Sequence, residues 1–108
     1  MNKNNFDFEG FNNKNFAVKC DTEDKAKDFL NFLHMNGYKW CTGVPLLENT
    51  SWEFHGKNTC YSSNGFRTVS YCKDNYYIND EIQIIEWEME EVKTYNNSEV
   101  VKMLSENP

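Results

Sequence analysis

The sequence predicts an α+β domain in which an antiparallel sheet of about four strands packs against one main helix. Three observations predict this class: a strand followed by a capped amphipathic helix, a later hairpin signal, and a last strand in which apolar and acidic residues alternate. The strands follow the helix as a group instead of alternating with helices, which favours α+β over α/β. The chain has 108 residues, so we expect one domain over residues 16–108, preceded by an N-terminal arm of residues 1–15.

The N-terminal arm is rich in asparagine and carries Phe6, Phe8 and Phe11. Phe6 and Phe8 alternate with polar neighbours, as residues of a short strand do. An arm whose aromatic residues dock late on the domain fits the same pattern. We therefore expect residues 1–15 to form either a short strand or a loosely attached arm.

A strand over residues 16–20 and a helix over residues 23–36 form the best-defined unit. Asp21-Thr22 supplies an N-cap for the helix, and Gly37 follows it in the position that needs a left-handed backbone. Apolar residues recur along the helix at the spacing of one buried face. They are Ala26, Phe29, Leu30 and Leu33.

Short strands and turns are expected after this helix. A glycine and a proline interrupt regular structure, so we expect a loop through about Thr50. Trp52 and Phe54 alternate around Glu53, as in a short strand that ends near Gly56. A hairpin is predicted next, with strands over residues 59–62 and 66–72. Its turn is Asn64-Gly65, a pair that accepts positive φ.

The last predicted strand covers residues 82–90, and a short C-terminal helix is predicted over residues 99–104. Three apolar residues alternate with three acidic ones in the strand, so one face is expected to be buried and the other to carry carboxylates. The apolar residues are Ile85, Trp87 and Met89, and the acidic ones are Glu86, Glu88 and Glu90.

The chain carries 17 acidic and 11 basic side chains, which give a formal net charge of −6. A nucleic-acid backbone is bound through basic groups that displace its counterions, so we expect no direct contact with nucleic acid. Negative charge suits docking on a basic protein surface. No apolar run reaches the roughly 20 residues of a membrane span, and the N-terminus lacks an apolar secretion signal. We therefore expect a cytoplasmic protein without a membrane partner.

The sequence gives no pattern of a metal or catalytic site. The cysteines show no C-x-x-C spacing, so we predict free thiols and neither a metal nor a cofactor. Cys41, with His34 and His55 not far along the chain, is the one candidate nucleophile, but a buried structural cysteine is the commoner case. Carboxylates on a wet strand face are poor acids at neutral pH. We predict no catalytic residues and no enzyme.

Glycine-rich phosphate-binding motifs are missing as well. A nucleotide or another small molecule could still be held by aromatic rings that stack on it and by basic side chains at its phosphates. The residues of this alternative ligand site are Lys39, Trp40, Trp52, Tyr61 and Arg67. The same aromatic residues are equally suited to a core.

Several short motifs resemble small proteins encoded by phages and prophages of Gram-positive bacteria. They are Phe16-x-Val18-Lys19-Cys20 with the capped helix after it, Gly37-Tyr38-Lys39-Trp40-x-x-Gly43, and Ile84-Ile85-Glu86-Trp87. The resemblance covers about residues 16–90. Such accessory proteins are often non-enzymatic, and some of similar size and acidity block host antiviral systems such as CRISPR effectors. The resemblance implies an anti-defence inhibitor in the host cytoplasm and assigns no site residues.

From the residues and the resemblance we expect a protein that inhibits its target by stoichiometric binding. The expected partner is a host protein with a basic surface, such as a nucleic-acid-binding defence effector, because complementary charge speeds encounter and suppresses wrong partners. The predicted protein-binding surface consists of Glu81, Glu86, Glu88, Glu90 and Glu91. The alternative is a module that sequesters a small molecule or nucleotide at the ligand site above.

Overall fold

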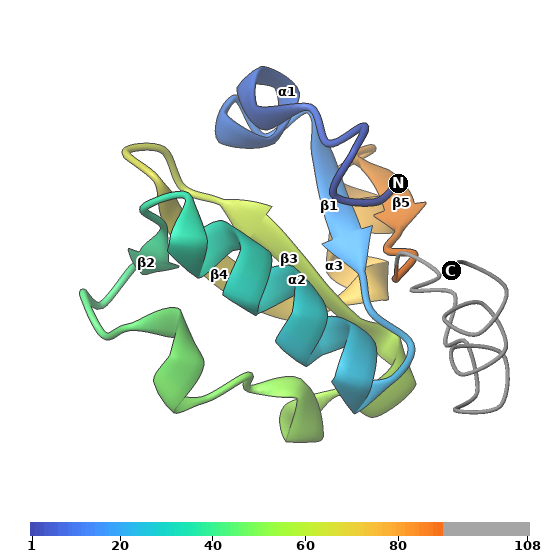
Figure 1. The fold of residues 1–108 in the computed structure, drawn as a ribbon. Coiled ribbons are helices and arrows are strands. Elements are labelled where there is room, and N and C mark those ends of the chain that lie inside the picture. The colour runs from blue at the N-terminus through green and yellow to red at the C-terminus, as the bar shows by residue number, and fades with distance from the viewer. Residues whose placement is uncertain (90–108) are drawn as a thin grey trace, which may run out of the picture.

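Five strands form one mixed sheet in residues 1–89, the part of the chain that the computed structural model describes. Their order across the sheet is β2-β4-β3-β1-β5 (Figure 1). The strands are β1 (Phe16–Lys19), β2 (Lys39–Trp40), β3 (Thr59–Ser63), β4 (Thr68–Lys73) and β5 (Gln83–Glu86). β3 is antiparallel to β1 and β4, whereas β5 is parallel to β1 and β2 is parallel to β4. The α+β class is confirmed, and the purely antiparallel sheet is wrong.

The two parallel pairs arise from connections that sequence reasoning missed. A short helix, α3 (Asp74–Asn79), carries the chain back across the sheet, so β5 lies beside β1 in the same direction. β2 falls in the segment that was predicted to be a loop. There the Lys39 amide donates to the Arg67 carbonyl over 3.1 Å, and the Cys41 amide donates to the Val69 carbonyl over 3.0 Å. Parallel strands need such crossovers, whereas a hairpin connects antiparallel strands.

The strand and helix predicted around residues 16–36 are confirmed. The main helix, α2, spans Glu23–Met35, and the Thr22 side chain caps it by accepting from the Lys25 amide at 3.2 Å. All four residues of the predicted apolar stripe are buried. Gly37 follows with a φ of +86°, the left-handed conformation that ends the helix.

The N-terminal segment forms a short helix, α1 (Phe8–Asn12), so the expected short strand is wrong. The Asp7 side chain accepts from the Gly10 amide at 2.9 Å and caps this turn, which favours helix over an extended chain. Phe6 and Phe11 are buried in the core beneath α2. The Tyr38 hydroxyl donates to Asn12 and ties α1 to the segment after α2.

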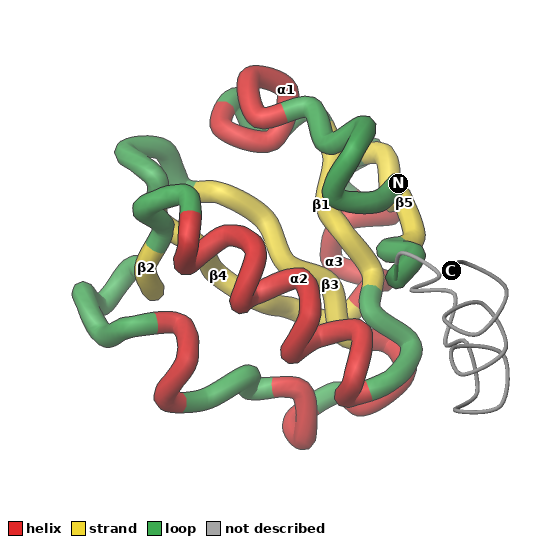
Figure 2. Tube along the Cα trace, in the orientation of Figure 1, coloured by secondary structure: helices red, strands yellow, loops and turns green. Residues whose placement is uncertain are grey.

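Buried residues lie in two clusters on opposite faces of the sheet. Figures 1 and 2 show α2 in front of the strands and α3 behind them. The cluster beneath α2 contains most of the aromatic residues, with Phe29 and Trp87 among the fully buried ones. The cluster beneath α3 consists of Ala17, Cys60 and Tyr77. The sheet is therefore covered on one face by a long helix and only partly on the other.

The middle of the chain forms short 3₁₀ turns alongside α2 (Figure 2). These are η1 (Leu46–Glu48), η2 (Trp52–Phe54) and η3 (Gly56–Asn58), so the strand predicted over residues 52–54 is wrong. Ser51 has a φ of +56° before η2, and this left-handed step starts a turn instead of an extended chain. None of the helices within residues 1–89 is long and apolar enough to cross a bilayer.

The hairpin is confirmed, but its turn is wider than predicted. Ser63 pairs with Val69, so residues 64–67 form the turn and β4 begins at Thr68. Gly65 has positive φ as expected, and so do Phe66 and Arg67. The last strand is shorter than predicted, since β5 ends at Glu86, and Met89 is 45% exposed instead of buried. The helix predicted over residues 99–104 lies outside the described residues.

Candidate functional site

The carboxylates predicted as a protein-binding surface lie around β5. Glu86 and Glu88 are both exposed, on either side of the fully buried Trp87. Glu81 is exposed at the other end of β5, in the turn after α3, with a φ of +57°. Glu90 and Glu91 lie outside the described residues. The described part of this surface therefore has two carboxylates at one end of an edge strand and a third at the other end.

Positive groups lie close to these carboxylates. The N-terminal ammonium of Met1 donates to the Glu86 carbonyl at 3.2 Å, and Lys19 is the register partner of Glu86 across the β1–β5 pair. Lys19 also pairs with Asp74 at 3.2 Å. Opposite charges so close together weaken the negative potential of the β5 end.

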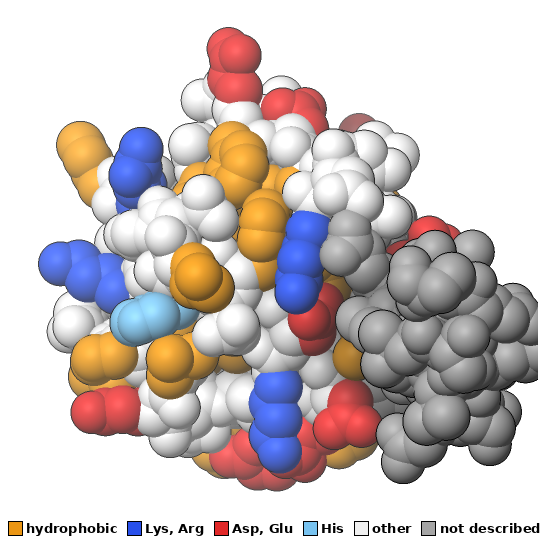
Figure 3. All heavy atoms as spheres, viewed as in Figure 1, with side chains coloured by type: hydrophobic (Ala, Val, Ile, Leu, Met, Phe, Trp, Pro, Cys, Tyr) orange, Lys and Arg blue, Asp and Glu red, His pale blue; other side chains and the backbone are white. Residues whose placement is uncertain are grey.

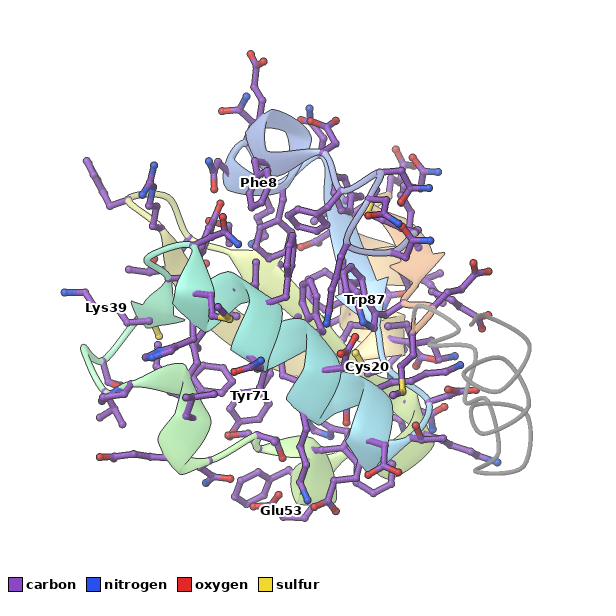
Figure 4. All side chains as sticks on the ribbon, in the orientation of Figure 1. Phe8, Cys20, Lys39, Glu53, Tyr71 and Trp87 are labelled. Atoms are coloured by element: carbon purple, nitrogen blue, oxygen red, sulfur yellow. The ribbon has the colours of Figure 1, made fainter. Side chains whose placement is uncertain are left out.

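The residues of the predicted ligand site separate into core and surface. Tyr61 is fully buried, and its hydroxyl donates to the Thr50 carbonyl at 2.7 Å. Trp52 donates its indole N–H to the Cys20 carbonyl at 2.9 Å. Lys39 and Arg67 are exposed, and Figure 4 shows Lys39 pointing away from the body of the molecule. Trp52 and Tyr61 thus hold the fold together and are not exposed stacking platforms.

Trp40 does lie at a hollow in the surface, with a volume of about 570 Å³. The lining residues come from β2 and the segment after it, from η1 and the turn after it, and from β4: Trp40, Cys41, Thr42, Val44, Glu48, Asn49, Ser51, Ser70 and Tyr71. We call this the Trp40 hollow. Its volume falls in the range of small-ligand pockets.

The walls of the Trp40 hollow are fixed by contacts within the protein. The indole N–H of Trp40 donates to the Asn49 carbonyl at 3.1 Å, and the Trp40 amide donates to the Val44 carbonyl at 3.0 Å. The Tyr71 ring lies edge-on to the Trp40 ring, with ring centres 5.8 Å apart, and is stacked on Phe54, also with centres 5.8 Å apart. Trp40 itself is only 7% exposed. The hollow is therefore formed before any ligand binds.

A second hollow of about 340 Å³ adjoins the first and shares Glu48 and Asn49 with it. Glu23 and Glu53 also line it, and Figure 4 shows Glu53 at the lower edge of the molecule. Lys27 is the one basic residue among the described lining residues of the two hollows, and it pairs with Glu23 at 3.3 Å. Acidic side chains gather along this lower edge in Figure 3.

We call Glu23, Glu48 and Glu53 the carboxylate rim. Sequence reasoning missed it because these residues lie in α2, η1 and η2, which are adjacent only in the folded chain. Tyr71 was missed for the same reason, since β4 reaches the hollow through its pairing with β2. No local motif in the sequence marks any of these four positions.

The cysteines do not form a reactive centre in the described residues, where all four are free. Burial raises the pKa of Cys60 to about 12 and that of Cys20 well above its usual range, so both remain thiols at neutral pH. Cys41 is exposed in the Trp40 hollow, and His55 packs instead on the Tyr71 ring at 6.0 Å. Within residues 1–89, no group of three or more possible metal ligands is found.

The geometry therefore offers a preformed aromatic hollow with an acidic rim, and a second group of carboxylates at β5. We compared the chain with protein-family models, with curated proteins and with solved structures. None of the three comparisons found a match.

Proposed function

We propose that this chain is a non-enzymatic binding protein that inhibits its target by covering a basic surface of it. The observation that carries the proposal is the carboxylate rim, in which three acidic side chains from separate elements line two adjoining hollows. The one lysine among the described lining residues is paired with Glu23, so the rim keeps a net negative charge. A shaped, acidic, partly apolar surface is suited to a basic protein partner.

The target that we propose is a host defence effector with a basic groove that holds nucleic acid, as the resemblance to small phage proteins implies. An acidic protein seated in such a groove competes with nucleic acid for the same cationic side chains. The net charge of −6 supports rapid encounter with a basic partner. Inhibition would take place in the cytoplasm of the host cell.

The β5 carboxylates are part of the proposal as a second candidate surface. Glu86 and Glu88 are exposed and could extend the acidic interface. The carboxylate rim and the β5 surface are tested against each other by charge reversal. One variant is Glu48→Lys with Glu53→Lys, and the other is Glu86→Lys with Glu88→Lys.

A matched control changes the charge equally at exposed sites outside both surfaces. Glu9→Lys, Asn13→Lys and Asn15→Lys, in and after α1, together shift the net charge by the same amount. Any loss of inhibition caused by total charge alone appears in this control too. Circular dichroism checks that each variant is folded.

The assay titrates the chain into purified CRISPR effector–guide complexes and follows binding of target DNA by fluorescence anisotropy. We expect inhibition that saturates at one chain per effector and weakens as salt rises above about 0.15 M, because exposed charges are screened. The rim reversal should abolish inhibition, while the control should not. A wild-type chain that inhibits no effector, or a rim reversal that inhibits as well as wild type, would sink the proposal.

A second function, sequestration of a small molecule, is favoured by the size and preformed walls of the Trp40 hollow. A thermal-shift screen with nucleotides tests it, since a ligand at a hundred times its Kd adds about 2.7 kcal/mol to the free energy of unfolding. The arrangement argues against a nucleotide, because Lys39 and Arg67 do not line the hollow and its one charged lining residue is Glu48.

A further inference from the structure

The Trp40 hollow has the chemistry to receive a cation. Its described lining contains the exposed edge of the otherwise buried Trp40 indole, the partly buried phenol ring of Tyr71 and one charged side chain, the carboxylate of Glu48. Within residues 1–89, Glu48 is exposed and makes no ion pair. Aromatic faces attract cations through their quadrupole, and a carboxylate attracts them through its charge.

Basic side chains near the hollow do not neutralise it. Lys39 precedes Trp40 in β2, and successive strand residues point to opposite faces, so the lysine lies on the other side of the strand. Lys27 lines the adjoining hollow and is paired with Glu23. Glu53 adds a further negative charge there. The potential at the Trp40 hollow therefore favours cations and repels phosphate groups.

Among cationic side chains, arginine fits this hollow better than lysine. A guanidinium is planar, stacks on aromatic rings and is more weakly hydrated than an ammonium, so it loses less on entering a partly apolar pocket. It can pair with a carboxylate while its plane lies on a ring. The volume of about 570 Å³ is ample for one such side chain.

We infer that the Trp40 hollow is the anchor of the interface and holds one arginine side chain of the partner, packed against the Tyr71 ring and the exposed edge of Trp40 and paired with Glu48. This inference rests on the proposed function, because a basic nucleic-acid groove supplies exposed arginines. The fixed positions of both rings reduce the entropy lost on binding. Residues buried in preformed pockets at the centre of an interface often dominate its binding energy, and arginine is common among them.

The test uses short peptides and needs no partner protein. Acetyl-Gly-Arg-Gly-amide is titrated against the full chain, with binding followed by the NMR signals of the Trp40 indole N–H and the Tyr71 ring. The matched probe replaces arginine by citrulline, which has nearly the same shape and no charge. We expect the citrulline peptide to bind at least about tenfold more weakly and the lysine peptide several-fold more weakly.

Glu48→Gln should lower the affinity for the arginine peptide by about three- to tenfold, since it removes one partly exposed ion pair and keeps the side-chain shape. Glu9→Gln, on α1, is the matched control and should leave binding unchanged. Tyr71→Leu keeps apolar bulk and removes the ring, and it should weaken binding further, with folding checked by circular dichroism.

Three results would overturn the inference: no perturbation of the Trp40 and Tyr71 signals, equal binding of the citrulline or lysine peptide, or a nucleotide that binds where the arginine peptide does not. The peptide titration tests the anchor and the inhibition assay tests the proposed function, so failure of one can be told from failure of the other. A chain that inhibits an effector but binds no arginine peptide keeps its proposed function without this anchor. A chain that binds the arginine peptide and inhibits nothing keeps the anchor and loses the function.

Discussion

The two faces of the sheet are covered by helices of different length, and their side chains differ accordingly. α2 has 13 residues and lies over a large cluster rich in aromatic residues, whereas α3 has six and packs on a much smaller hydrophobic cluster that contains one aromatic residue, its own Tyr77. Beneath α2, the Phe29 and Trp87 rings lie 4.7 Å apart. Beneath α3, the Tyr77 and Ser62 hydroxyls share a hydrogen bond of 2.9 Å.

The difference shows where the fold gains its stability. A buried aromatic side chain removes a large apolar area from water, and aromatic pairs add to this gain. A hydroxyl hydrogen bond contributes about 1 kcal/mol, because folding only exchanges it for bonds to water. The α2 face should therefore carry most of the free energy of folding, and the α3 face should chiefly fix the position of β5.

The largest expected effect is that of Phe29→Ala, on the α2 face. Phe29 is fully buried and its ring lies within 6.0 Å of Phe6, Phe11, Tyr61 and Trp87. Truncation should lower the free energy of unfolding by about 4 kcal/mol, through lost burial and the cavity left behind. Urea denaturation measures the loss. The control is Phe54→Ala, which removes a ring that is 61% exposed and should cost less than about 1 kcal/mol. Equal losses would show that the aromatic cluster is not the main source of stability.

Alkaline pH should weaken the α3 face through Cys60. Burial, with the nearby Asp74 charge, raises the pKa of this thiol from 9.0 to about 12. Between these values the unfolded chain has lost the proton and the folded chain still holds it, so stability falls as pH rises. The slope is up to about 1.4 kcal/mol per pH unit, so the loss reaches roughly 3 kcal/mol by pH 11.

Cys60→Ala should make this alkaline slope shallower but not remove it, because burial also raises the pKa of the Cys20 thiol. The slope is measured as urea midpoints from pH 8 to 11 in the presence of a reductant. Cys41→Ala is the matched control, because it removes an exposed cysteine and keeps the buried Cys60 thiol in place. A slope that is the same in both variants would place the alkaline sensitivity elsewhere, for example in Tyr77, whose pKa burial also raises to about 12.

A smaller effect is expected from Tyr77→Phe, which deletes the hydroxyl bonded to Ser62 and keeps the ring. Ser62 retains only a long contact of 3.5 Å with Ser70, so the variant should lose about 1 kcal/mol of unfolding free energy. Tyr76→Phe is the control on the same helix, since that side chain is 44% exposed. A loss of about 4 kcal/mol would mean that the α3 face is as important for stability as the α2 face.

How much of the fold the sequence predicts depends on how local each signal is. The Thr22 cap, the apolar stripe of α2 and Gly37 all act within a few residues, and their predictions are confirmed. β2 consists of two residues that are extended because β4 lies beside them, so no local pattern could reveal it. α3 lacks a side-chain cap and was missed for a similar reason.

In the candidate site, too, only features with a local signal could be predicted from the sequence. Trp40 was singled out as an aromatic residue, and it does line a hollow. Trp52 and Tyr61 looked equivalent in the sequence, yet their polar atoms are bonded to backbone carbonyls in the core. Glu48 and Tyr71 line the same hollow because β4 pairs with β2 and because the Asn49 carbonyl, next to Glu48, accepts from the Trp40 indole. Residue type alone does not carry that information.

The smallest expected effect has the opposite sign and concerns Phe66, an aromatic residue that belongs to neither face. Its side chain is 101% exposed at the hairpin turn, and its φ of +53° is left-handed, as is the +56° of Arg67 next to it. This conformation costs a non-glycine residue roughly 1–2 kcal/mol, and asparagine tolerates it better. Phe66→Asn should therefore raise the free energy of unfolding by about 0.5 kcal/mol.

Phe66→Ala distinguishes the contribution of the aromatic ring to stability from that of the left-handed backbone in this turn. It removes the aromatic group but keeps the Cβ that makes the left-handed conformation unfavourable, so its unfolding free energy should equal that of wild type. The two variants are compared by urea denaturation under identical conditions. If Phe66→Ala destabilises the chain, the ring makes stabilising contacts in the folded state. If both variants leave stability unchanged, the left-handed turn is not strained, and the exposed aromatic residue at this turn does not lower the free energy of unfolding.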